Sequence, residues 1–384
     1  MIKGEKMNWG KFDLKSTKAK VVIVGVLLIA IIIIIISIAV SCSSKKDVNR
    51  DDSVFVENII ETEAETQTQK LAVDPHLNQS RSKLTGLWVP SATVNNSPVA
   101  VMYSNVFDAM PQSSIGSADI VFESLVEGGI TRLCAVFENC TTLEKIGPVR
   151  SCRTYYLLFA KEFEATYVHF GYSDYAEEFL QMKIMHSLDG MVYCNFYRTT
   201  DRVAPHNAYT SWSGIMGSVA SKGYPTVYPD NYQQPLTFNN DEKKDLTISN
   251  GQTCLEFYPG YVYNKPYFIY NEKDKQYYRY QFDGSQIDAE TGQQLKYKNI
   301  LVKYVTGEYW PNGTPNYIVT GTGKGLYITD GKAVAVTWKN SSEYGSTKYY
   351  DEEGKEIILN QGKTWICQIE ATSASAVKIL DTIQ

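Results

Sequence analysis

The sequence predicts an α+β protein: an α/β N-terminal folded domain followed by a mainly β C-terminal domain, behind a membrane anchor and a flexible tether. Three features of the 384-residue chain predict this arrangement. One long apolar run lies near the start. Between residues 84 and 225, strand-like runs alternate with segments of helical periodicity. From residue 251 to the end, short strand-like runs are separated by turn dipeptides.

Composition and charge argue against several classes of protein. A net charge of -5 argues against a general nucleic-acid partner, because nucleic acids need a basic face. The seven cysteines include no C-x-x-C pair, and the histidines include no H-E-x-x-H spacing. We therefore expect no metal and no cofactor. Buried free thiols are preferred over disulfides, because cysteine is common in protein cores.

Residues 1–42 are expected to anchor the protein in a membrane. Residues 21–40 are almost continuously apolar, and about 20 apolar residues match the thickness of a bilayer core. Six lysines precede this run, which predicts a cytoplasmic N-terminus and folded domains outside the cytoplasm. Residues 39–42 are similar to a bacterial lipobox, in which Cys42 would be lipidated and cleaved. Either the helix or a lipid on Cys42 would hold the protein at the membrane.

Two further segments are expected to connect the anchor and the domains. Residues 43–83 are polar and acidic with little apolar content, which predicts a disordered tether. Residues 226–250 are rich in Pro, Asn and Lys and are expected to link the two folded domains.

The first folded domain, residues 84–225, should contain alternating strands and helices. Apolar, β-branched runs predict strands at residues 99–103, 118–125, 130–137 and 165–170. Apolar faces at helical spacing predict helices at residues 154–163, 174–182 and 213–221, and Ser173 is a good N-cap for the second. In α/β domains, loops at the strand ends carry function.

The second folded domain, residues 251–384, should be mainly β. Turn dipeptides such as Asp330-Gly331 separate runs with strand character at residues 254–258, 267–270, 277–282, 300–305, 317–320, 326–328, 334–339 and 365–369. The glycine-rich residues 321–325 lack the order of a phosphate-binding loop and have no helix pattern after them, so a strand turn or bulge is preferred.

Three arginines form the main candidate site. Arg132 begins a predicted strand, and Arg150 and Arg153 follow a Gly-Pro turn before a predicted helix. Guanidinium groups suit carboxylate and phosphate oxygens, so together these arginines would bind an anion. Asp119 and Glu123 are included in the same candidate ligand site. The alternative is that the arginines pair internally with nearby carboxylates, Asp119, Glu123 and Glu127.

A second candidate loop spans residues 197–210. Arg202 and Asn207 lie in this Pro-containing stretch and are candidate ligand contacts. His206 in the same loop and His169 at the end of a predicted strand are candidates for general acid/base catalysis near neutral pH. Structural hydrogen bonding is the alternative for both histidines.

These motifs together resemble the YerB-type lipoprotein family, a bacterial family that carries a domain-of-unknown-function label (family 3048). The resemblance covers roughly residues 84–380. It is carried by residues 98–102, 111–113, 118–123, 127–132, 145–151, 167–169, 204–207, 320–325 and 362–365. The resemblance implies a lipoprotein with two domains outside the membrane and implies no reaction.

Two functions remain open at this point. One is a lipoprotein that binds an anionic cell-envelope ligand or a protein partner through the arginines. The other is a cell-envelope hydrolase or transferase that acts on a phosphate-bearing or glycan substrate, with a histidine as acid/base and the arginines stabilising negative charge. Whether the protein is an enzyme is left open.

Overall fold

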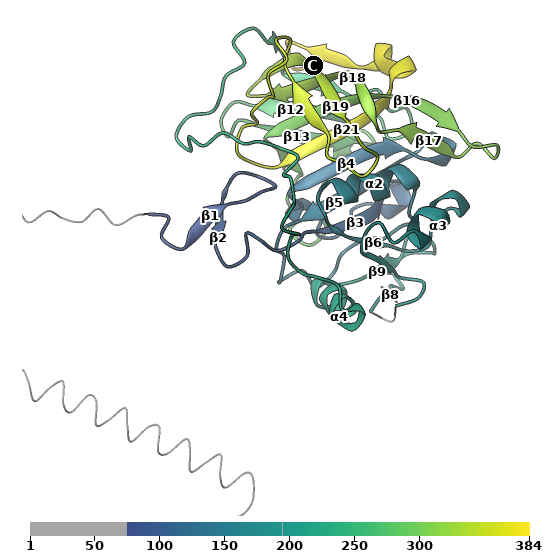
Figure 1. Cartoon of the computed structure of the whole chain (residues 1–384). Coiled ribbons are helices and arrows are strands. Elements are labelled where there is room, and N and C mark those ends of the chain that lie inside the picture. Colours follow the sequence, from purple (N-terminus) through teal and green to yellow (C-terminus); the bar gives the residue numbers. More distant parts are fainter. Residues whose placement is uncertain (1–74, 194) are drawn as a thin grey trace, which may run out of the picture. The chain divides into compact units, whose positions relative to one another are not determined.

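The computed structural model describes residues 75–193 and 195–384. Its largest element is a mixed sheet of twelve strands (Figure 1). Strand β17 (Pro315–Ile318) pairs with β16, and β20 (Lys348–Tyr350) pairs with β19. Across the sheet the other strands are β10 (Gln252–Thr253), β19 (Lys332–Asn340), β18 (Gly321–Thr329), β16 (Asn299–Tyr309), β21 (Thr364–Glu370), β4 (Ile120–Leu125), β5 (Thr131–Phe137), β3 (Val99–Ser104), β6 (Thr166–His169) and β7 (Ser187–Asp189).

Strand β21 joins the two halves of this sheet. Near the C-terminus of the chain, it pairs in parallel with β16 on one side and with β4 on the other. Ile366 lies opposite Leu301 in one register and opposite Phe122 in the other. The strands expected in two successive folded domains therefore share one hydrogen-bonded sheet, and the protein is mainly β with few helices.

Three α-helices occur in the described residues, all before residue 223. They are α2 (Thr154–Glu162), α3 (Asp174–Gln181) and α4 (Trp212–Lys222), which agree with the predicted helices to within one residue at each end. Ser211 caps α4, because its hydroxyl accepts a hydrogen bond from the Gly214 amide. Short 3-10 turns are η1 (Phe107–Ala109), η2 (Ile115–Ser117), η3 (Glu127–Gly129) and η4 (Ala371–Ala376).

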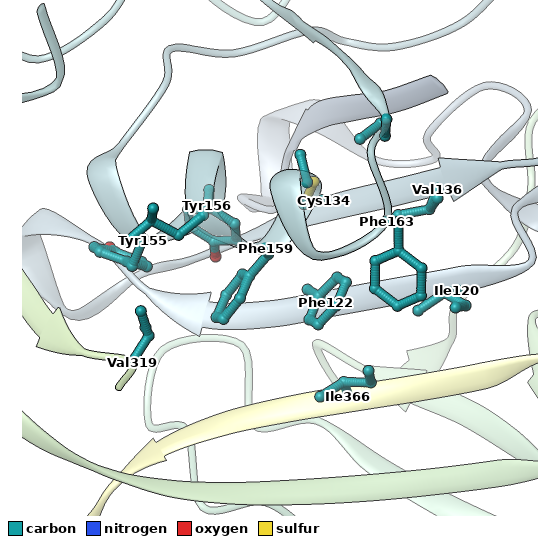
Figure 2. Close-up of a cluster of buried hydrophobic side chains, with 14 of the residues drawn as sticks. Ile120, Phe122, Cys134, Val136, Tyr155, Tyr156, Phe159, Phe163, Val319 and Ile366 are labelled. Carbon is teal, nitrogen blue, oxygen red and sulfur yellow. The ribbon is translucent and has the colours of Figure 1, made fainter. Parts of the chain in front are cut away.

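Helix α2 is buried on nearly every side, which explains its weak amphipathic pattern. Its Phe159 stacks on Phe122 of β4 with ring centroids 4.6 Å apart. Figure 2 shows Phe159 and Phe163 beside Phe122, with Ile366 of β21 in the same hydrophobic cluster. The helix therefore packs over the junction between the two halves of the sheet.

A second sheet covers part of the opposite face. Its six strands are β14 (Gly284–Ser285), β13 (Gln276–Gln281), β12 (Tyr267–Asn271), β11 (Glu256–Tyr258), β22 (Lys378–Leu380) and β15 (Lys296–Tyr297), the last of which pairs with β13. The inner side chains of β12 reach the first sheet, where Phe268 contacts Trp365 edge-to-face at 5.7 Å between centroids. This sheet-on-sheet core is typical of β-rich folds.

The end of the segment expected to be a tether is ordered. Strand β1 (Gln79–Arg81) pairs with β2 (Trp88–Pro90). Arg81 lies 3.9 Å over the Trp88 ring and donates a hydrogen bond to Gln361 at 2.8 Å. Residues 43–83 were expected to be disordered because they contain few apolar side chains. The pairing with β2 and the polar contacts of Arg81 hold residues 79–81 in place without them. The structure does not describe residues 1–74, which include the predicted anchor at residues 1–42 and the lipidation candidate Cys42. Within the residues that it does describe, no helix has the length and apolar character of a membrane span.

The glycine-rich residues 321–325 form the beginning of strand β18, paired residue by residue with β19, so the segment is a regular strand instead of the expected strand turn or bulge. Gly323 lies opposite Trp338 on β19. A β-carbon at Gly323 would lie 2.6 Å from the indole nitrogen of Trp338, closer than any real contact. The glycine therefore makes room for a cross-strand tryptophan.

Candidate functional site

The candidate arginines lie at one edge of the large sheet. Strands β3, β6 and β7 run parallel, so their carboxyl ends meet at the same edge. Strand β5 is antiparallel to β3, and its register places Arg132 opposite Ser104, the last residue of β3. The carboxyl edge of parallel strands is the usual position of ligand sites in α/β sheets.

The segment that carries Arg150 and Arg153 crosses this edge. The amide of Arg150 donates to the Met102 carbonyl at 2.9 Å, and the amide of Cys152 donates to the Gly171 carbonyl at 2.9 Å. Gly147 begins the crossing with a φ of 142°, and a β-carbon there would lie 2.9 Å from the Ala208 carbonyl oxygen. The glycine lets this segment pass close to the neighbouring chain and places two arginines at the edge.

Arg153 is held in a bidentate ion pair with Glu127. Its Nε donates to one carboxylate oxygen at 2.6 Å and its Nη2 to the other at 2.7 Å. Burial raises the pKa of Glu127, but the hydrogen bonds and charge of Arg153 outweigh it, so the pKa lies below its ordinary value. Arg153 is therefore paired internally, with Glu127, as the alternative to an anion site predicted.

Arg132 is a buried cation with no carboxylate partner in the described residues. Its side chain is 5% exposed, and its Nη1 donates to the Ser151 carbonyl at 2.6 Å. Burial lowers the pKa of Arg132 to about 10, helped by the positive charges of Arg153 and Arg150. The three guanidinium groups therefore lie close enough to repel one another. We call Arg132, Arg150 and Arg153 the arginine cluster.

Arg150 is the member of the arginine cluster with the weakest internal contacts. It is half-buried, and its Nη1 donates to the Pro205 carbonyl at 3.4 Å. Burial lowers its pKa, and so do the charges of Arg153 and Arg198. Arg198, which the prediction did not include among the site residues, donates to Asn207 at 2.7 Å and lies over the Phe170 ring. Its position in the same loop as Arg202 was the available signal.

The residues of the predicted loop divide into two groups. Arg202 donates to the carbonyls of residues 109–111, and Asn207 donates to the Thr199 carbonyl at 2.9 Å, so both hold the loop in place. His206 lies beside the arginine cluster, with Nδ1 3.2 Å from the Ser104 hydroxyl. Burial lowers the pKa of His206, and the charge of Arg150 lowers it further. His206 is therefore neutral near pH 7.

His169 is used inside the protein. Its Nδ1 donates to the Gly171 carbonyl at 2.8 Å, so Nε2 must accept the hydrogen bond from the Ser187 hydroxyl at 2.7 Å. Its side chain is 1% exposed, and burial lowers its pKa despite the nearby Asp189 carboxylate. The structure therefore gives His169 the hydrogen-bonding role that was the alternative to catalysis.

The two candidate carboxylates lie away from the arginine cluster. Glu123 is fully buried and forms an ion pair of 2.7 Å with Arg279 on β13, a partner that sequence reasoning missed. Asp119 accepts a hydrogen bond from the Glu138 amide at 2.8 Å, and burial raises its pKa to about 6. The sequence had placed both in the candidate ligand site or, alternatively, as internal partners of the arginines. Glu123 instead faces the core between the two sheets.

The fold defines a mainly β protein whose two sequence regions are joined by one shared sheet. Residues 84–225 match the N-terminal domain, and residues 257–366 the C-terminal domain, of a family described as "Protein of unknown function (DUF3048)". The chain belongs to this family, so the resemblance seen in the sequence is confirmed.

Two comparisons with individual proteins agree. A relative named "Putative lipoprotein YerB" from Bacillus subtilis (strain 168) is 30% identical over 312 residues, which cover 80% of this chain and 92% of the relative. The crystal structure of the YerB protein from Bacillus subtilis is 28% identical, with a TM-score of 0.69, and the match covers 78% of this chain and 99% of that chain. Neither description states a reaction or a ligand.

Proposed function

We propose that the chain is a membrane-anchored, extracytoplasmic lipoprotein that binds an anionic cell-envelope ligand or partner at the arginine cluster. The observation that carries the proposal is Arg132, a buried cation without a carboxylate partner in the described residues. The N-terminal apolar run and the lipoprotein name of the relative support the location. We also propose that the N-terminal folded region is an α/β domain that follows a membrane anchor and a flexible tether.

The charge balance of the cluster favours an anion. The charges of the three guanidinium groups act on one another, and among them only Arg153 forms an ion pair in the described residues, with Glu127. Uncompensated buried charge is unfavourable by several kcal/mol, so a bound anion would stabilise this edge of the sheet. A guanidinium has five N–H donors, and Arg132 and Arg150 each use one in the contacts above. The unused donors suit a phosphate or carboxylate group.

His206 favours one second candidate, an enzyme that transfers or hydrolyses a phosphate-bearing or glycan substrate. A neutral imidazole beside cationic groups can accept a proton while the arginines stabilise developing negative charge. Turnover of a substrate by the native protein, lost in His206→Gln while ligand binding persists, would separate this candidate from a pure binding protein.

A binding titration tests the proposal. Full-length protein would be titrated with inorganic phosphate and polyphosphate, followed by calorimetry and by the melting temperature. A ligand that binds the native state at a hundred times its Kd stabilises by about 2.7 kcal/mol. Arg150→Gln should remove most of this effect with little loss of stability, because Arg150 has the weakest internal contact in the cluster.

Lys378→Gln is the matched control, because it removes the same charge from an exposed position on β22. Its titration should equal that of the parent. Binding that is equally weakened in both variants would show a general charge effect and contradict a site at the arginine cluster. No binding of either anion to the parent would also count against the proposal.

A further inference from the structure

A second candidate site contains none of the residues of the arginine cluster and is lined mainly by residues between 245 and 363. A cavity of about 520 Å³ opens between the turn at Gly116–Ser117, the β12–β13 hairpin, the end of β15 and the residues before β21. This volume is within the range of small-molecule sites. Both matched regions of the family contribute to its wall.

Two ion pairs form part of the cavity wall. Lys296 lies 2.9 Å from Asp274, and Lys298 lies 2.7 Å from Asp245. Both lysines leave N–H donors unused, because an ammonium has three. Asp245 leaves one carboxylate oxygen unused, whereas Asp274 accepts from Lys296 and Tyr278 at Oδ2 and its Oδ1 is buried. The wall therefore offers donors and acceptors side by side.

The other polar groups of the cavity wall also include both hydrogen-bond donors and acceptors. Lys363 donates to the Gly116 carbonyl and has no carboxylate within ion-pair distance in the described residues. The side-chain amides of Gln276 and Gln293 have no hydrogen-bond partner in the part of the protein that the structure describes, and each amide both donates and accepts. These groups are available to a ligand.

The charges around the cavity do not favour an ion of either sign. The three wall lysines oppose two wall aspartates, and the charges of Asp119 and Asp288 also act on Lys363 from behind the wall. An anion would meet the aspartates, and a cation would meet the lysines. A hydroxyl group donates and accepts at once, so a ligand with many hydroxyls matches both kinds of wall group.

We propose that this cavity binds an uncharged, hydroxyl-rich ligand of the saccharide class. The proposal is independent of the anion site, because it uses different residues and an uncharged ligand. Ser117 adds a hydroxyl group to the wall, which suits the same ligand chemistry.

The test uses full-length protein in a detergent without a sugar headgroup. N-Acetylglucosamine, its short oligomers and glucose would be titrated by saturation-transfer NMR and calorimetry. We expect binding of at least one saccharide, weakened about tenfold or more in Asp274→Asn, which removes the charge that positions the Lys296 ammonium in the wall. Gln293→Trp, at an exposed turn position, should block the cavity without a change in the core.

Glu272→Gln is the matched control, because this exposed carboxylate lies two residues before Asp274 and does not line the cavity. Saccharide binding should persist in Glu272→Gln and in Arg150→Gln, which separates this site from the arginine cluster. No saccharide binding to the parent, or binding unchanged in both cavity variants, would overturn the proposal. Phosphate binding that is lost in Lys363→Gln would also overturn it, because the cavity would then be an anion site.

Discussion

The buried ion pair between Glu123 and Arg279 gives the most quantitative prediction. Both side chains are fully buried, with 2.7 Å between the charged groups, and Arg279 also lies 4.1 Å from the centroid of the Trp365 ring. Removal of one partner of a buried pair costs about 3–5 kcal/mol, because the other charge is left unpaired. Arg279→Met keeps most of the side-chain volume but leaves Glu123 charged.

The lower end of that range is expected for Arg279→Met. Glu123 would keep neutral donors, from Thr131 at 3.0 Å, Asn264 at 3.1 Å and Trp365 at 3.2 Å. We therefore expect a loss of about 3 kcal/mol in the free energy of unfolding, a large fraction of the total for most proteins.

Urea unfolding of the unit Ala72–Gln384, followed by tryptophan fluorescence, measures this loss. The double variant Glu123→Gln/Arg279→Met should lose less than the sum of the single variants by about 2 kcal/mol, because it leaves no buried charge. A loss below about 1 kcal/mol for Arg279→Met, or full additivity in the double variant, would refute the reasoning.

Three further predictions concern pH, packing and the arginine cluster. Burial lowers the pKa of Lys303 to about 8, below its value in the unfolded chain, so the stability that the neutral amine allows is lost as pH falls through 8. Between pH 8 and 10, the free energy of unfolding of the parent should therefore rise by about 2 kcal/mol relative to that of Lys303→Met, measured by urea unfolding. A difference between the two proteins that stays constant with pH would contradict the shift. Gly323→Ala should lower stability by about 1–3 kcal/mol because of the cross-strand indole, whereas Gly284→Ala, with open space around it, should change little in the same thermal melts. The pKa of His206, measured by NMR titration, should rise in Arg150→Gln because one repelling charge is removed, and an unchanged value would place the two groups apart.

The local elements were predictable and the long-range pairings were not. Helices α2 and α4 were predicted from apolar residues that lie within a few positions of each other. The parallel pairing of β21 with β4 joins residues separated by more than two hundred positions, and no local pattern encodes it. The ordered β1 was missed in part for the same reason, because Arg81 also donates to the distant Gln361, besides its local contacts with β2 and Trp88.

The candidate site shows the same division. The Gly-Pro turn before a helix at Arg150 and Arg153 was predictable from local sequence, whereas the place of both arginines beside the end of β3 was not. Glu123 was misplaced because successive side chains of a strand take opposite faces, and the sequence does not tell which face is toward the arginines. Its partner Arg279 lies in the other matched region of the family and carries no local signal.

The shared strand β21 has a consequence for how the chain is made. Strand β4 emerges from the ribosome early, yet its parallel neighbour is encoded by residues 364–370, close to the end of the chain. Until synthesis is nearly complete, one edge of the early half of the sheet has no partner, and unpaired strand edges are prone to aggregation. A nascent or truncated chain that stops near residue 225 would therefore present β4 as an open edge until residues 364–370 are made.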